Sequence, residues 1–155
     1  LWERFRAAAP PRCVVQERTG AYLAWRFDQN PGRAYMYHLA LDGAGALAGF
    51  LVTRVAPLLG VPTLILVDAL ALPGAGLALF RLLAADARRR ARELGCALMA
   101  TMVTRPDPLF PDPIRLGLLP TPYRFTFITR ELAGGTEIQD DTLRWHLMWA
   151  DTDDV

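Results

Sequence analysis

With 155 residues, of which 52% are apolar and 21% charged, the chain is long enough for one domain with its own core and too apolar to be disordered. Its net charge of +1 provides no field to attract a polyanion, so we expect no nucleic-acid partner. No apolar run reaches the roughly 18 residues needed to cross a bilayer, so we expect no membrane partner either.

Residue types that are missing or rare narrow the chemistry further. The sequence has no serine and no lysine, which excludes a serine nucleophile and a Schiff-base lysine. Cys13 and Cys96 stand in neither a metal-binding nor a redox spacing, so we expect two buried thiols of a cytoplasmic protein. We expect no resident metal.

The hydrophobic pattern predicts an α/β chain. In order, it predicts helices at 1–9 and 14–27, strands at 35–41 and 47–55, a buried strand at 62–70, a helix at 77–94, a strand at 96–104, a short helix at 112–116, and strands at 123–130 and 145–149. The first two strands should form a hairpin. Because a helix joins the strands at 62–70 and 96–104, those two should be parallel neighbours.

The turn between the buried strand and the long helix is the first candidate site. It contains Gly74, Ala75 and Gly76, and the helix follows from Leu77. A helix N-terminus presents free backbone N–H groups and a positive dipole end, and glycine lets a ligand approach the backbone, so the turn can hold a phosphate. An ordinary helix start with flexible residues is the alternative interpretation.

This element order resembles that of the GNAT acyltransferases. The motifs that carry the resemblance are Tyr22-Leu23-Ala24-Trp25-Arg26-Phe27 with Pro31 and Tyr35, Leu66-Val67-Asp68-Ala69-Leu70, and Trp145 with Trp149-Ala150-Asp151-Thr152-Asp153. They are similar to the C-terminal half of bacterial proteins with two GNAT-like halves. The resemblance implies that residues 1–155 form a single GNAT-like domain of class α/β (α+β), either by itself or as the C-terminal part of a longer chain. It also implies a mixed, mostly antiparallel sheet with a parallel central strand pair and helices on both faces.

The resemblance implies transfer of an acyl group from acetyl-CoA or another acyl-CoA to an amine, on a small molecule or another acceptor. The pyrophosphate would lie on the amides of Gly74, Ala75, Gly76 and Leu77, and pantetheine would lie between the splayed ends of the parallel strands. In such enzymes a polar or basic residue precedes the glycines, and here residues 71–73 are Ala, Leu and Pro.

Acyl transfer also needs a base for the amine and an acid for the leaving thiolate. Asp68 interrupts the buried strand where the family can place its base, but it could equally have a structural role by pairing with Arg26 or Arg54. At the position of the family's tyrosine acid this chain has Pro113, which leaves Tyr123 as the substitute unless its ring belongs to the core.

The alternative function is a non-catalytic GNAT-like half that does not bind CoA and packs on a partner. Aromatic residues near both ends of the chain favour it: Trp2, Phe5, Trp25, Phe27, Trp145 and Trp149. Either the two end segments fold against each other, or they form an apolar patch that a second GNAT-like domain or a second copy in a homodimer covers.

Overall fold

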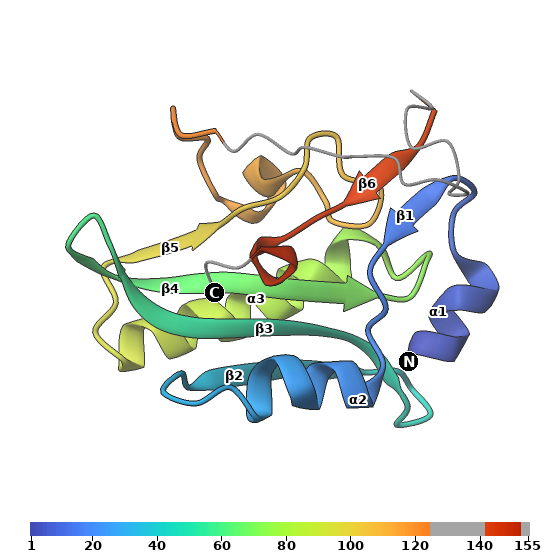
Figure 1. Ribbon diagram of the computed structural model, residues 1–155, viewed down its shortest axis with the longest axis horizontal. Helices are drawn as coiled ribbons and strands as arrows, with labels where there is room; N and C mark the ends of the chain where they lie inside the picture. The colour runs from blue at the N-terminus through green and yellow to red at the C-terminus, as the bar shows by residue number, and fades with distance from the viewer. Residues whose placement is uncertain (125–141, 153–155) are drawn as a thin grey trace, which may run out of the picture.

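The computed structural model describes residues 1–124 and 142–152. Its elements are α1 (Trp2–Ala8), β1 (Cys13–Val15), α2 (Gly20–Leu23), the π-helical turn η1 (Ala24–Asp28), β2 (Tyr35–Leu41), β3 (Leu47–Leu58), β4 (Val61–Ala71), α3 (Gly76–Glu93), β5 (Leu98–Thr101), the 3-10 turn η2 (Pro113–Leu116), β6 (Arg144–His146) and the 3-10 turn η3 (Trp149–Asp151). Four strands form a sheet in the order β2-β3-β4-β5, and β1 pairs with β6 in a small second sheet (Figure 1).

The sheet has the strand directions that the sequence predicts. β2, β3 and β4 are antiparallel neighbours, whereas β4 and β5 run parallel, and β4 lies inside the sheet. β3 extends beyond its predicted end because only Leu59 and Gly60 connect it to β4. Both residues have positive φ, 52° and 78°, as the tightest hairpin turns require.

A bulge in β4 separates this strand from β5. Val52 of β3 pairs with Asp68 and Thr53 pairs with Leu66, so Val67 is an extra residue in β4. A bulge bends its strand and changes the direction of the groups that follow. Within the described residues, pairing of β4 with β5 ends at Leu66, although β4 continues to Ala71 alongside β3.

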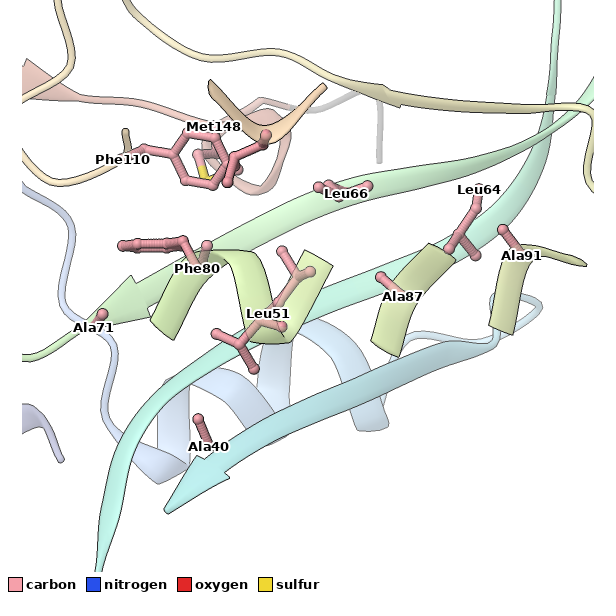
Figure 2. Close-up of a cluster of buried hydrophobic side chains, with 13 residues drawn as sticks. Ala40, Leu51, Leu64, Leu66, Ala71, Phe80, Ala87, Ala91, Phe110 and Met148 are labelled. Atoms are coloured by element: carbon pink, nitrogen blue, oxygen red, sulfur yellow. The ribbon is translucent and has the colours of Figure 1, made fainter. Parts of the chain in front are cut away.

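The helices lie on both faces of the sheet. The long helix α3 covers one face, and α2 and η3 lie over the other (Figure 1), where Phe5 of α1 also packs. Beneath α3, a first core cluster includes Leu66, Phe80 and Met148, and the Phe80 and Phe110 rings meet edge to face at 5.2 Å (Figure 2). A second cluster on the opposite face includes the fully buried Phe5 and Phe27.

Three sequence predictions need correction. Residues 14–27 are not one helix, because β1 occupies their start and helical structure begins only at Gly20, after the N-cap Thr19. The last strand ends at His146, and Trp149–Asp151 form a 3-10 turn instead. Tyr123 is not in a strand, and residues 125–130 of that predicted strand lie outside the described part.

The two end segments of the described chain pack against each other. β1 pairs with β6, and Trp2 and Trp149 both contact the second core cluster. Of the aromatic residues near the ends, Trp25 is the one with a large exposed fraction, 61%. No helix among the described residues is long and apolar enough to cross a membrane.

Candidate functional site

The predicted phosphate-binding turn lies between the end of β4 and the start of α3. Gly74 and Gly76 have φ of 88° and 68°, in the left-handed region that favours glycine. The amide of Ala75 donates to the carbonyl oxygen of Leu72 at 3.0 Å, which closes the turn. A Cβ atom built at either glycine would meet no atom within 4 Å, so the turn is open on its outer side.

The residues around this turn supply backbone groups rather than side chains. Ala75 is the N-cap of α3 and has no polar side chain to satisfy the first amides of the helix. Leu77 is half-buried against the core under α3, so only its amide could serve a ligand. Leu72 and Pro73 likewise offer no charged group to a phosphate.

Residues of the C-terminal segment lie beside the end of β4, after Leu66, where the pairing with β5 has ended. Nε2 of His146 is 3.1 Å from the carbonyl oxygen of Ala69. Met148 is fully buried in the cluster that contains Leu66 and Ala69, and it forms an isolated antiparallel bridge with Val103. The segment that contains His146 and Met148 therefore covers this side of β4.

His146 is held between two hydrogen-bond acceptors. Its Nδ1 lies 2.9 and 3.0 Å from the carboxylate oxygens of Asp107, and its Nε2 faces the Ala69 carbonyl. Because a carboxylate and a carbonyl oxygen accept, both ring nitrogens donate and the imidazole is charged. Burial alone would lower the pKa of His146, but the hydrogen bond and the charge of Asp107 raise it above its usual value.

Asp107 is fixed by several donors besides His146. Its Oδ1 accepts from the amides of Leu109 and Phe110 at 2.8 and 2.7 Å, and the Thr104 hydroxyl lies 2.9 Å from its Oδ2. The loop that carries Asp107 also lines a pocket of about 370 Å³ just beyond the end of β5. The pair of Asp107 and His146 thus joins this loop to β4.

Asp68 is buried and paired with Arg18. Nε of Arg18 lies 2.8 Å from Oδ2 of Asp68, an electrostatic contact rather than an aligned hydrogen bond. Nη2 of Arg18 donates to both oxygens of Asp151 at 2.7 and 2.9 Å. Burial raises the pKa of Asp68, and the charge of Arg18 opposes this effect.

The predicted partners of Asp68 were Arg26 and Arg54, and the partner in the structure is Arg18. Arg26 instead donates to the carbonyl oxygens of Ala150 and Thr152. The sequence pattern does not single out Arg18. It lies in the segment 14–27 that the pattern predicts as a helix, on which it would be one more solvent-exposed arginine.

The two candidate catalytic residues differ in their exposure to solvent. Asp68 has no exposed surface, whereas Tyr123 is 63% exposed. Arg18 is the ion-pair partner of Asp68, and Asp151 and His146 also act on its charge. Tyr123 is therefore not a core aromatic, which was its alternative assignment.

Comparisons with known proteins bear on the fold. No family model matches the sequence, and no curated protein matches it significantly. Two solved structures of the aminoglycoside N-acetyltransferase AAC(6′)-Iy are similar, one in complex with CoA and one with the bisubstrate analogue CoA-S-monomethyl-acetylneamine. Each is 19% identical and covers 84% of this chain and 92% of its own, with TM-scores of 0.52 and 0.53. AAC(6′)-Iy is a member of the GNAT superfamily, and the fold of this chain is therefore that of the GNAT acyltransferases.

Proposed function

We propose that this domain binds an acyl-CoA and transfers its acyl group to an amine, with acetyl-CoA as the simplest donor. The observation that carries the proposal is the open glycine turn at the end of β4, where the strand has separated from β5 and α3 begins. In this arrangement the backbone amides of Gly74, Gly76 and Leu77 bind the pyrophosphate at a helix N-terminus, while the amide of Ala75, the fourth predicted donor, closes the turn on Leu72. The CoA complexes of AAC(6′)-Iy, which has the same fold, support the choice of ligand.

The acceptor in this proposal is an amine of a small molecule. An ammonium group must lose a proton before it attacks a thioester, and the departing thiolate must gain one. We propose Asp68 as the base and Tyr123 as the acid. The raised pKa of Asp68 supports its role, since a base works best near the ambient pH, and Tyr123 is an exposed residue that a ligand can reach.

Asp68 can act only if the segment over it moves. Its carboxylate has no exposed surface, and Arg18, Asp151 and His146 surround it. The proposed acyltransferase therefore includes a rearrangement of residues 146–151 when acyl-CoA binds.

A specific observation favours the alternative, a GNAT-like half that packs on a partner domain and does not bind CoA. His146 already occupies the carbonyl of Ala69, and Met148 fills the space beside the open part of β4. On the outer surface Trp25, Leu39 and Leu41 are exposed, which is compatible with a covering domain or a second copy.

Calorimetric titration with acetyl-CoA separates the two functions. The sharpest variant is Gly76→Asn, because asparagine tolerates the left-handed conformation while its side chain fills the open side of the turn. Gly95→Asn is the matched control, since Gly95 has the same φ of 68° at the other end of α3 and equally open surroundings.

We expect the wild type and Gly95→Asn to bind acetyl-CoA and Gly76→Asn to lose binding while it remains folded. If the wild type does not bind, the non-catalytic alternative stands. If Gly76→Asn binds as tightly as Gly95→Asn, the turn is not the pyrophosphate site.

A further inference from the structure

A hollow lined by arginines lies between α3 and η2. It has a volume of about 280 Å³, and its lining residues are Arg81, Ala84, Arg88, Arg115 and Leu116. Arg81, Ala84 and Arg88 are spaced three and four residues apart, so they share one face of α3. Arg115 comes from the opposite wall, in η2.

The three guanidinium groups are not neutralised within the described part of the chain. The carboxylates of α3 are engaged elsewhere, because Asp86 contacts His38 and Arg89, and Glu93 contacts Arg89 and Arg90. Among the described residues, Arg81, Arg88 and Arg115 make no salt bridge. Like charges that converge on one hollow repel each other, and a bound anion would remove that cost.

The hollow is also partly preorganised. Nη2 of Arg88 donates to the carbonyl oxygen of Leu116 at 2.9 Å, which fixes this guanidinium against the wall. Leu116 and Ala84 are buried, and the small side chain of Ala84 leaves room between the arginines. η2 ends at Leu116, and its C-cap Gly117, with a φ of 80°, turns the chain away directly afterwards.

The charge and the location identify the class of ligand. Guanidinium groups bind phosphate oxygens with paired hydrogen bonds, and several of them together suit the dianion of a phosphomonoester. Arg81 lies five residues after Gly76, so the hollow begins about 7.5 Å along α3 from the glycine turn. One nucleotide that carries both a pyrophosphate and a separate phosphomonoester would reach both places.

We propose that Arg81, Arg88 and Arg115 bind the 3′-phosphate of CoA and make this chain selective for CoA over its 3′-dephospho form. The proposal rests on the proposed function and names which part of the ligand this second site recognises. The glycine turn takes the pyrophosphate through backbone amides, and the hollow takes the terminal phosphate through charged side chains.

The test is a pair of titrations, with CoA and with 3′-dephospho-CoA, on three forms of the protein. Arg81→Gln/Arg115→Gln removes two charges but keeps the side-chain length. Arg92→Gln is the control, because Arg92 is an exposed arginine of the same helix that does not line the hollow. The unfolding curve of each form shows whether it is folded. Because the substituted arginines are exposed, we expect each variant to remain folded.

We expect wild type and Arg92→Gln to bind CoA at least about tenfold more tightly than 3′-dephospho-CoA. The double variant should bind both ligands with the affinity that the wild type has for 3′-dephospho-CoA. Equal wild-type affinity for the two ligands would overturn the inference and leave the proposed function intact.

If neither ligand binds, the proposed function fails. A titration with adenosine 3′,5′-bisphosphate then tests the arginine site by itself. Binding of this nucleotide to wild type but not to Arg81→Gln/Arg115→Gln would support the arginine site by itself. Absence of binding to wild type would overturn it.

Discussion

The imidazole of His146 donates from Nε2 to the carbonyl oxygen of Ala69, a residue 77 positions earlier in the chain, at 3.1 Å. The carbonyl of Ala69 is available because the bulge at Val67 has taken this end of β4 away from β5. Asp107 holds the other ring nitrogen, so one side chain links three segments that are distant in sequence. This contact attaches the C-terminal segment to the part of β4 that, among the described residues, does not pair with β5.

The stability of the protein should therefore depend on pH through His146. The contact with Asp107 raises the pKa of His146 in the folded state above the unfolded value near 6.5. A raised folded pKa means that this contribution is complete below pH 6.5 and is lost as the pH rises through the folded value. Urea unfolding on both sides of that pH should show the decrease, and His146→Gln should have a flatter profile. Equal slopes for both proteins would contradict the charged state of His146.

Removal of Arg18 should strongly destabilise the protein. Arg18→Met leaves Asp68 and Asp151 buried without their cation, and the loss of one partner from a buried pair costs about 3–5 kcal/mol of the free energy of unfolding. The double variant Arg18→Met/Asp68→Leu should lose less than the sum of the two single changes, because it removes both charges. Urea titrations of the four proteins measure this coupling, and strict additivity would show that the pair is not coupled.

Gly49→Ala should destabilise the sheet by about 1–3 kcal/mol through overpacking. A Cβ atom at Gly49 would lie 2.8 Å from Cδ2 of Leu79 and 3.1 Å from the carbonyl oxygen of Leu70. α3 and β4 approach β3 too closely at this point for any side chain. Gly43→Ala is the matched control, since a Cβ atom there meets nothing within 4 Å, and it should change the unfolding free energy by less than about 0.5 kcal/mol.

Cys13 should react slowly with alkylating reagents. Burial and the nearby charge of Asp107 raise the pKa of its thiol from 9.0 to about 11. At pH 9.0 about half of an ordinary thiol is ionised but only about 1% of this one, so the rate should be about fiftyfold lower than that of a free thiol. Iodoacetamide labelling of Cys96→Ala, in which Cys13 is the remaining cysteine, measures this rate in the native state and in urea. The same rate in both would show that the folded protein does not protect Cys13.

The sequence allowed the central part of the fold to be predicted because its local signals agree with its tertiary structure. The apolar run in β4 and the helical spacing in α3 match the surfaces that these elements bury. The alternation in β2 predicts a strand but not its buried face, because the structure buries His38 and Ala40 and exposes Leu39 and Leu41. The segment at 14–27 failed because β1 contributes three residues to a pairing with β6, a partner more than a hundred positions away. Local periodicity does not report such a contact.

The candidate site was predictable only in part, for a related reason. Gly74 and Gly76 stand at positive φ, which the sequence signals directly through glycine. The partners of Asp68 could not be found in this way, since Arg18 and Asp151 approach it from opposite ends of the chain. The arginine hollow could not be predicted, because Arg81 and Arg88 have the spacing of a solvent-exposed helix face. Only the folded chain places Arg115 of η2 opposite them.

The parallel pairing of β1 with β6 has a mechanical consequence. Cys13–Val15 and Arg144–His146 come from the two ends of the described chain and run in the same direction (Figure 1). A force that pulls these ends apart therefore acts along the strands, and their hydrogen bonds must yield together rather than one after another. The contact between Arg18 and Asp151, just beyond both strands, carries part of the same load. Stretched from its ends, the domain should resist shear at this small sheet, whereas a pull that peels β2 from the edge of the main sheet would break its hydrogen bonds in sequence.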